Sequence, residues 1–480
     1  MRVLKDLQPK KVFWYFEKIC AIPHGSHNTK RLCDYCEQFA QEHLLAYIRD
    51  DYNNIILYAP GTVGYENSAP VMIQGHLDMV CEKDADCDID FEREGLRLEY
   101  KDGMISAKGT TLGGDDGIAI AYALAILDSA IPHPPLEVVF TSDEEVGMLG
   151  AAKLPFDQLE ARTMLNIDSE DEGYLLVSCA GGCRINCMIE FARETKQGVP
   201  VTVTVGGLTG GHSGVEIIHG RANANMLLGR LLDELNVPYQ LVEVNGGMKD
   251  NAIPREAQAK LLTAQEDVAA LTDAVKSLEE IYAAENHVTD PELHIITAAA
   301  EQPTQLAVIT ETDTNRIISA LRNLPNGVQC MSSSIEGLVQ TSLNLGVLRT
   351  EGDTVSMTFA VRSSAASELE ETVDKIVNVM QSVNGKISRY GDYPAWEYKE
   401  DSPLRELMCK VFTEQYGHEP VVHAIHAGVE CGLFAGALDG LDCVSFGPDL
   451  KDIHTTSERM DVASVQRTWN FLKRVLKELK

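Results

Sequence analysis

The sequence has no apolar run approaching the roughly 20 residues that a membrane-spanning helix requires. Residues 1–11 are polar and lack the apolar core of a signal peptide. The twelve cysteines lack the dense, regular spacing of a disulfide framework, and the pairs Cys81/Cys87 and Cys183/Cys187 lack the paired spacing of a zinc ribbon. We therefore expect a cytoplasmic protein with reduced cysteines that does not bind a membrane.

Positive charge is also scarce, because 41 Lys and Arg residues stand against 72 Asp and Glu residues, for a formal charge of -31. So acidic a chain repels nucleic acids, and we expect no nucleic-acid partner. The hydrophobic content of 44% is that of an ordinary soluble globular protein. A length of 480 residues exceeds the roughly 250–300 that one hydrophobic core supports, so at least two domains are expected.

The first third of the chain alternates helical and strand patterns. This predicts an α/β fold with a largely parallel sheet flanked by helices. From about residue 183 the pattern changes to an inserted α+β domain, and the first pattern resumes near residue 398, where Ser402 and Pro403 suit a helix start. We expect a catalytic domain, residues 1–182 and 398–480, interrupted by an inserted domain, residues 183–397.

Helices are predicted over 12–20, 29–43, 116–128, 221–235, 267–285, 313–323 and 367–383, and strands over 54–58, 136–140, 184–192, 201–205, 354–361 and 441–446.

A first polar cluster, Gly75-His76-Leu77-Asp78, ends the apolar run that begins at Val71. Alternate residues of a strand point to the same side, so His76 and Asp78 are predicted to share one cleft. A metal-binding histidine usually needs a carboxylate that orients its ring, and Asp78 suits that role.

A second cluster, Leu112 to Gly117, places Asp115 and Asp116 directly before an apolar helix. One interpretation is a glycine turn in which an aspartate caps the helix. The other is that Asp115 bridges two cations, with one oxygen facing each ion. The capping interpretation explains one aspartate well and its neighbour poorly.

A third cluster, residues 141–145, follows the predicted strand 136–140, and it is either a solvated loop or part of a site. Of its adjacent carboxylates, one can bind a metal while the other takes a proton from water. A fourth cluster contains Asp168, and His454 lies in a loop after a C-terminal strand, where a surface histidine is the simpler interpretation. Two ions that share one carboxylate need two further protein ligands each. The candidate set therefore has five members, His76, Asp115, Glu145, Asp168 and His454, whose N and O donors suit zinc first, then cobalt or manganese.

At these motifs the whole chain resembles the di-zinc exopeptidases related to aminoacylase and glutamate carboxypeptidase, and within them the aminoacyl-histidine dipeptidases. The segments that carry the resemblance are residues 75–80, 112–117, 143–147, 210–214, 250–254, 426–432 and 453–455.

The resemblance implies that His76 and Asp168 hold one zinc, Glu145 and His454 hold the other, and Asp115 lies between them. It also implies that Glu144 is the general base, that Asp78 orients His76, and that the Asp115–Asp116 peptide is cis. The inserted domain would be a lid. In it His212 would stabilise the oxyanion, and Asn251, Arg362 and Gly428 would hold the carboxylate end of the substrate.

Several histidines leave alternatives open. His212 lies among glycines and could equally be a turn residue, and His219 competes with it for the oxyanion role. Arg362 could equally form a structural salt bridge. One of His423 and His426 could contact substrate, whereas His24 and His27 are interpreted as loop residues.

The expected activity is the hydrolysis of dipeptides, including Xaa-His dipeptides such as carnosine, by a zinc-bridging water that Glu144 activates. The alternatives are an N-acyl amino-acid deacylase, which needs the same metals and base, and an inactive homologue that binds peptides or metal. A lid of this size could supply His212 within one chain, so the sequence predicts a monomer or a homodimer.

Overall fold

The computed structural model describes residues 2–480, which form two compact units. The first unit contains residues 2–178, 398–424 and 429–480, and the second contains 179–397 and 425–428. The second unit begins four residues before the predicted boundary at 183, and it includes a short segment from the C-terminal part of the chain. The predicted boundaries differ from this division in those two places.

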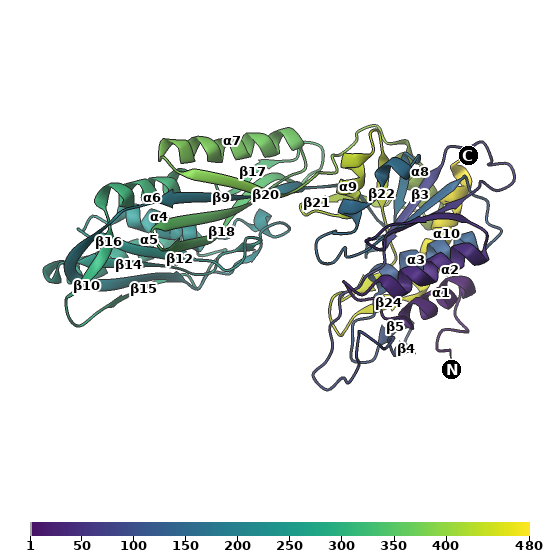
Figure 1. Cartoon of the computed structure of the whole chain (residues 1–480), viewed down its shortest axis with the longest axis horizontal. Coiled ribbons are helices and arrows are strands. Elements are labelled where there is room, and N and C mark those ends of the chain that lie inside the picture. Colours follow the sequence, from purple (N-terminus) through teal and green to yellow (C-terminus); the bar gives the residue numbers. More distant parts are fainter. Residues whose placement is uncertain (1) are drawn as a thin grey trace. The chain divides into compact units, whose positions relative to one another are not determined.

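An eight-stranded sheet forms the centre of the first unit (Figure 1). Strands β6, β3, β7 and β22 are parallel to one another, whereas the pairs β1–β2, β2–β6 and β22–β8 are antiparallel. The sheet is therefore mixed, with parallel pairing only at its centre, because the connection from β1 to β2 is too short for a crossover. In spatial order the strands are β1 (Ala46–Arg49), β2 (Ile55–Ala59), β6 (Leu136–Thr141), β3 (Val71–His76), β7 (Thr163–Asn166), β22 (Asp442–Ser445), β8 (Tyr174–Cys179) and β21 (Val421–Ile425).

Six helices accompany this sheet. α3 packs against β3 and α1, and α8 packs against β22 and α10. Residues 116–126 of α3 are all buried, as expected for a helix that is apolar around its circumference. Ser402 caps α8 by accepting a hydrogen bond from the Arg405 N–H, and Pro403 is the first helical residue, as predicted. The helices are α1 (Lys10–Cys20), α2 (Lys30–Glu42), α3 (Gly114–Leu127), α8 (Pro403–Tyr416), α9 (Glu430–Ala437) and α10 (Val462–Glu478).

A small antiparallel sheet in the same unit joins the N-terminal and C-terminal parts of the chain. Its order is β23-β24-β5-β4, and β24 pairs with β5. The loop between β23 and β24 carries His454, so this pairing fixes both ends of that loop. The strands are β4 (Leu98–Lys101), β5 (Met104–Ala107), β23 (Leu450–Lys451) and β24 (Arg459–Asp461).

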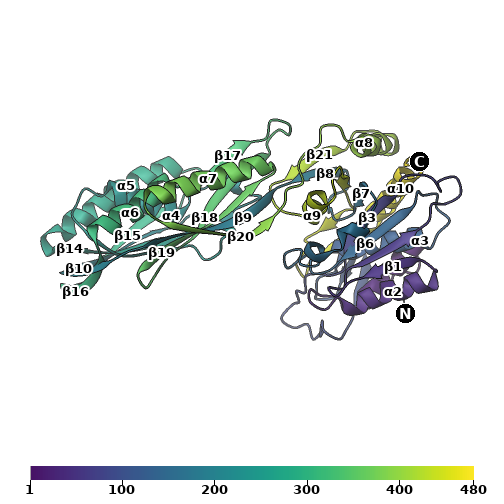
Figure 2. The same cartoon turned by 45° about the horizontal axis from the view of Figure 1, so that its top comes forward.

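The second unit is one ten-stranded sheet with helices on one face, visible in Figures 1 and 2. In β10, Val199, Val201, Val203 and Val205 are buried while the residues between them are half-exposed, which is the alternation of a sheet covered on one side. The path β15-β10-β14-β12-β18-β19-β9-β20 comprises β9 (Gly181–Glu190), β10 (Arg193–Gly206), β12 (Gln240–Gly246), β14 (Ala257–Thr263), β15 (His294–Ala299), β18 (Val339–Glu351), β19 (Thr354–Ser363) and β20 (Lys386–Tyr393), with β16 (Thr304–Ile309) beside β10 and β17 (Gly327–Met331) beside β18.

The helices of the second unit are α4 (Ala224–Glu234), α5 (Val268–Asn286), α6 (Glu311–Asn323) and α7 (Ala366–Ser382). α4 packs on the centre of the sheet and beside α6. Each of the four lies within two or three residues of its predicted bounds, because each has an amphipathic pattern that its burial follows. No helix within residues 2–480 is long and apolar enough to cross a membrane.

Candidate metal centre

Three parallel strands end at one edge of the first sheet and place polar side chains there. His76 is the last residue of β3, Glu144 and Glu145 follow β6, and Asp168 follows β7. Because neighbouring parallel strands end together, residues far apart in sequence come side by side. Asp115 joins them from the start of α3.

Asp115 faces two histidines with its two oxygens. His76 Nε2 lies 3.0 Å from Oδ1 of Asp115, and His454 Nε2 lies 3.2 Å from Oδ2. On the far sides, His76 Nε2 lies 3.4 Å from Asp168 Oδ1, and His454 Nε2 lies 3.0 Å from Glu145 Oε1. The five residues therefore form two groups of three that share Asp115.

The potential ligand atoms of each group lie within 4.8 Å of one another. One group is His76, Asp115 and Asp168, and the other is Asp115, Glu145 and His454. Glu144 belongs to a third such group, with His76 and Glu145. The structure thus brings the five predicted ligands and the predicted base into one cluster.

Asp78 is buried behind the cluster and connects its parts. The Nδ1 atom of His76 lies 3.0 Å from the Asp78 carbonyl oxygen, which leaves Nε2 directed at Asp115. The Asp78 carboxylate accepts hydrogen bonds from the Glu144 N–H at 2.9 Å and the Glu145 N–H at 3.2 Å. It also accepts one from the Ser26 hydroxyl at 2.9 Å. Asp78 therefore holds both the ring of His76 and the backbone of the loop after β6.

The start of α3 excludes the interpretation of Asp115 as a helix cap. The N-cap residue is Gly113, with φ of 64°, and no side chain caps this helix. Asp115 and Asp116 have non-helical backbone angles, and the peptide between them is cis, as the resemblance implies. Asp116 Oδ2 accepts a hydrogen bond from the His76 N–H at 3.1 Å, so each aspartate has a separate role.

Two buried glutamates that sequence reasoning missed support the cluster. Glu458 accepts hydrogen bonds from the backbone N–H groups of Leu112 at 2.7 Å and Gly114 at 2.9 Å, directly before Asp115. Glu430 Oε2 accepts hydrogen bonds from Gln74 Nε2 and the Thr141 hydroxyl, both at 2.6 Å. Glu430 lies in the quoted segment 426–432, which offered a signal. Glu458 follows no apolar run, and nothing local marked it.

The charges of the cluster shift the pKa values of its members. Burial opposes the imidazolium of His76, but the carboxylates of Asp168 and Asp115 outweigh it and raise its pKa. Hydrogen bonds to Asp115 and Glu145 raise the pKa of His454 to about 10. Burial raises the pKa of Asp168 to about 6, against the opposing effect of His76. Each histidine is thus paired with carboxylates that favour a positive charge at its position.

The surrounding carboxyls carry more negative charge than the two histidines offset. Burial raises the pKa of Glu144 well above its ordinary value, and Asp168 and Glu430 add to the effect. Burial raises the pKa of Glu430 to about 8. Divalent cations would offset this negative charge, and imidazole and carboxylate donors without a thiolate suit zinc, cobalt or manganese. The donor set therefore fits metal ions.

The second unit holds the predicted lid residues. His212 lies in β11 (Gly211–His212), which pairs with β13 (Ala252–Ile253), so Asn251 lies beside it. His212 Nδ1 accepts hydrogen bonds from the N–H groups of Gly214 at 3.2 Å and Val215 at 3.3 Å. Its ring proton therefore lies on Nε2, where it can be donated. His219 is exposed at the end of a short 3-10 helix, Ile217–His219.

Arg362 is only 5% exposed in β19, and Nη1 donates a hydrogen bond to the Ser213 hydroxyl at 2.9 Å. No carboxylate of the described chain forms an ion pair with it. Gly428 belongs to the segment 425–428 of the same unit and is half-buried. The second unit therefore contains all four predicted lid residues.

The remaining histidines have different surroundings. His24 and His27 lie outside helices, as predicted, but His24 is buried, with Nδ1 2.6 Å from the Ile22 carbonyl oxygen. The ring of His423 stands edge-on to Tyr174, with ring centroids 5.4 Å apart. The cysteines form no disulfides within residues 2–480, as expected.

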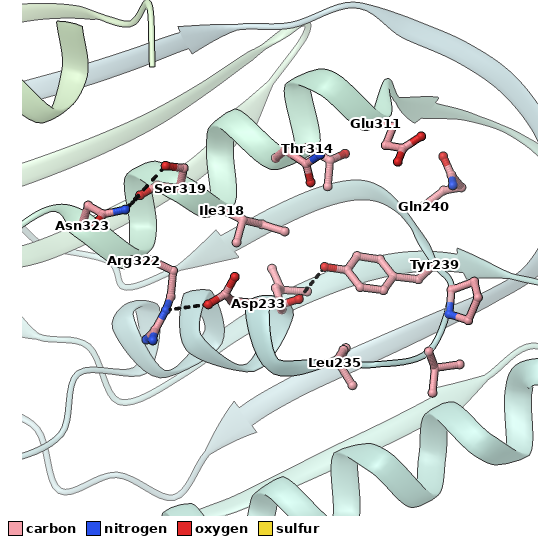
Figure 3. A pocket seen from close by; sticks show the side chains of 14 residues that line it. Asp233, Leu235, Tyr239, Gln240, Glu311, Thr314, Ile318, Ser319, Arg322 and Asn323 are labelled. Atoms are coloured by element: carbon pink, nitrogen blue, oxygen red, sulfur yellow. Dashed lines mark hydrogen bonds and ion pairs between the residues drawn. The ribbon is translucent and has the colours of Figure 1, made fainter. Parts of the chain in front are cut away.

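A separate hollow in the second unit, between α4 and α6, has a volume of about 790 Å³ (Figure 3). Its wall includes an ion pair of 3.0 Å between Arg322 and Asp233, and the hydroxyl of Tyr239, which donates to the Leu232 carbonyl oxygen. It contains none of the predicted site residues. In residues 2–480, the groups of side chains that could hold a metal all lie in the cluster around Asp115.

Residues 72–478 match the model of the peptidase family M20/M25/M40. The chain is 36% identical over 490 aligned positions to the cytosol non-specific dipeptidase of Escherichia coli (strain K12), covering 100% of this chain and 99% of that protein. The crystal structure of aminoacylhistidine dipeptidase from Vibrio alginolyticus is 36% identical, with a TM-score of 0.92 over 99% of this chain and 98% of that one. Aminopeptidase PepT from Bacillus cereus, 15% identical over 98% and 99% of the two chains, shares the fold alone, with a TM-score of 0.58.

These matches confirm the family resemblance and the predicted fold class, an α/β sheet with flanking helices and an inserted α+β unit. They also confirm that the chain is a hydrolase that acts on peptide bonds, with residues suited to divalent metal ions. With its family model matched over most of its length, the chain belongs to peptidase family M20/M25/M40.

Proposed function

We propose that this chain hydrolyses dipeptides, including those with a C-terminal histidine such as carnosine. Two relatives at 36% identity, one named a cytosol non-specific dipeptidase and the other an aminoacylhistidine dipeptidase, match nearly the whole chain. The observation that carries the proposal is the position of Asp115, whose two oxygens each face a different histidine. That arrangement suits a carboxylate shared by two ions.

Two divalent cations, with zinc the first choice and cobalt or manganese the alternatives, are proposed as cofactors. His76 and Asp168 would hold one, Glu145 and His454 the other, and Asp115 both. When bound, such a pair lowers the pKa of water and polarises the carbonyl of the peptide bond.

Glu144 is the proposed general base. Its carboxylate would take a proton from the attacking water and deliver it to the amine that leaves when the C–N bond breaks. Burial and neighbouring carboxylates raise the pKa of Glu144, which suits a group that must hold a proton between two steps. Asp78 would position it, because its carboxylate binds the Glu144 N–H.

The second unit is the proposed lid. His212 would donate Nε2–H to the developing oxyanion. Arg362, buried without an acidic partner, would bind the C-terminal carboxylate of the substrate with Asn251 and Gly428. The accepted hydrogen bonds at Nδ1 favour His212 over His219 for the oxyanion role, because they leave its other nitrogen protonated.

A cytoplasmic location is proposed from the name of the Escherichia coli relative. The oligomeric state, monomer or homodimer, is proposed to be catalytically neutral, because one chain contains both the metal cluster and His212. Sedimentation and activity, both measured over a dilution series of the enzyme, test this proposal. If a dimer were required, activity would fall as the dimer dissociates.

The deciding experiment is an assay of purified enzyme on β-alanyl-histidine, alanyl-histidine and N-acetyl amino acids, with and without a chelator. We expect hydrolysis of the dipeptides that a chelator abolishes and added zinc, cobalt or manganese restores. Preferential hydrolysis of N-acetyl amino acids would make the chain a deacylase. Metal uptake without turnover of any substrate would make it a binding protein.

A further inference from the structure

His426 is a buried histidine with one ring nitrogen unused. It is 5% exposed and follows β21, in the short segment that belongs to the second unit. Its Nε2 lies 2.7 Å from the hydroxyl oxygen of Ser342 in β18. Its Nδ1 is buried and makes no hydrogen bond of acceptable geometry within residues 2–480, although the backbone carbonyl of Val339 acts on the ring. Buried polar atoms are nearly always paired, so an unpaired one indicates a missing partner.

The Ser342 hydroxyl decides which nitrogen carries the proton. Ser342 is 1% exposed, and His426 Nε2 is its hydrogen-bond partner. A hydroxyl can donate or accept, and we assign its proton to Nε2 because Nε2 is the acceptor that the structure places beside it. With that assignment, the ring proton of the neutral imidazole lies on Nδ1.

Ser342 and Arg362 are direct partners on the adjacent antiparallel strands β18 and β19. Side chains of directly opposed residues stand on the same face of a sheet. The His426 ring, bound to Ser342, and the guanidinium of Arg362 thus lie near the same face of the sheet. The positive charge of Arg362 helps to lower the pKa of His426.

The loop of His212 closes this neighbourhood from another side. Arg362 donates to the hydroxyl of Ser213, which is 1% exposed. A Cβ at Gly214 would lie 2.7 Å from the His426 carbonyl oxygen, so only glycine permits that approach. Asp250, an acidic residue whose pKa Arg362 helps to lower, is already paired with Arg184 at 2.6 Å. This part of the second unit therefore contains buried hydrogen-bond donors, and its carboxylate at Asp250 is already used by Arg184.

A buried guanidinium without an anion is costly, and a carboxylate would satisfy both it and a neighbouring N–H. We propose that His426 binds the C-terminal carboxylate of the substrate through Nδ1–H, beside Arg362, with Ser342 fixing the tautomer. This rests on the proposed dipeptidase function. His426 then makes the enzyme select peptides with a free carboxylate over peptide amides.

The test compares alanyl-histidine with its C-terminal amide in the zinc-loaded enzyme and in the variants His426→Phe, His426→Asn, Ser342→Ala and His423→Phe. We expect His426→Phe to lower kcat/KM for the free acid by about 10- to 100-fold, mostly through KM, and to change the value for the amide by less than about threefold. His426→Asn, which keeps an N–H near the position of Nδ1, should recover much of the loss. Ser342→Ala should show an intermediate loss.

His423→Phe is the matched control, because His423 lies three residues away and packs on Tyr174. It should leave the ratio of acid to amide unchanged. Equal losses for acid and amide in His426→Phe, or no loss, would overturn the inference while leaving the dipeptidase function intact. Wild-type enzyme that cleaves neither compound would refute the proposed function and this inference with it. Melting temperature and metal content, measured for each variant, separate these outcomes from misfolding, and His426→Asn and Ser342→Ala remain informative if His426→Phe does not fold.

Discussion

Glu458 Oε1 accepts a hydrogen bond of 2.9 Å from the backbone N–H of Gly114, across 344 positions of the sequence. Gly114 directly precedes Asp115, and the other oxygen of Glu458 binds the N–H of Leu112. The turn that presents Asp115 is therefore held by one buried carboxylate from the C-terminal part of the chain.

Replacing Glu458 should weaken metal binding without removing a ligand. In Glu458→Gln the side chain keeps one carbonyl acceptor for the three N–H groups of Leu112, Gly113 and Gly114, so Asp115 loses its fixed orientation. We expect metal affinity to fall by about 10- to 100-fold, the usual effect of removing a group that orients a ligand. Competition with a zinc-binding dye measures this on apoenzyme. Glu301→Gln, at an exposed position, is the control. Equal affinities of Glu458→Gln and wild type would contradict the role.

Glu144→Gln should separate metal binding from turnover. The amide cannot take a proton from water, so kcat should fall by about 100-fold or more. Elemental analysis should still find the metal content of the wild type, because Glu144 is not among the five proposed ligands. Retention of full activity would exclude Glu144 as the base.

Substitutions at Asp115 and His454 should differ in how much metal they remove. Asp115→Asn alters the carboxylate that faces both histidines, so the binding of both ions should be weakened or lost. His454→Ala removes a ligand of one proposed ion and should spare the other. Equilibrium dialysis followed by elemental analysis gives the number of ions retained. The same stoichiometry in both variants would argue against a shared carboxylate.

The choice between His212 and His219 can be made kinetically. His212→Ala removes the proposed oxyanion donor and should lower kcat by about 100- to 1000-fold. His219→Ala, at an exposed position seven residues away, should lower kcat by less than about threefold. Steady-state rates on one dipeptide decide the matter, and the opposite ranking would assign the role to His219.

His426 should also make stability depend on pH. Burial, together with Arg362 and His212, lowers the pKa of His426 from 6.5 to about 3. Between pH 6.5 and 3, His426 is protonated in the unfolded chain and neutral in the folded chain. The free energy of unfolding therefore falls as the pH falls below 6.5. At pH 5.5 the loss is about 1.4 kcal/mol.

His426→Asn should lack this contribution. Its melting temperature should fall less than that of wild type between pH 7.5 and 5.5, measured by calorimetry at one ionic strength. Parallel curves for the two proteins would show that His426 takes up a proton in the folded state.

The site residues at strand ends were predictable because the signal is local. An apolar run that stops at a polar residue marks His76, Glu144 and Asp168, and parallel strands bring such ends together. The helices of the second unit were predictable from their amphipathic pattern. The antiparallel pairs β1–β2, β2–β6 and β22–β8 of the first sheet were not predicted, because pairing direction depends on partners that a strand pattern does not identify.

Glu458 and Ser342 show what sequence reasoning missed. Each acts through contacts with residues at least eighty positions away, and neither contributes to a periodic apolar pattern. The same holds for the free nitrogen of His426, which is recognisable only when every possible partner is placed around it.

The sequence by itself determined the family motifs, the candidate ligands and base, and the position of most helices and strands, because these depend on local patterns. Only the tertiary structure decided that Asp115 directs one oxygen to each histidine, that Glu458 holds its turn, and that Arg362 lacks an acidic partner. Those relationships depend on distances between atoms of segments that meet only when the chain has folded.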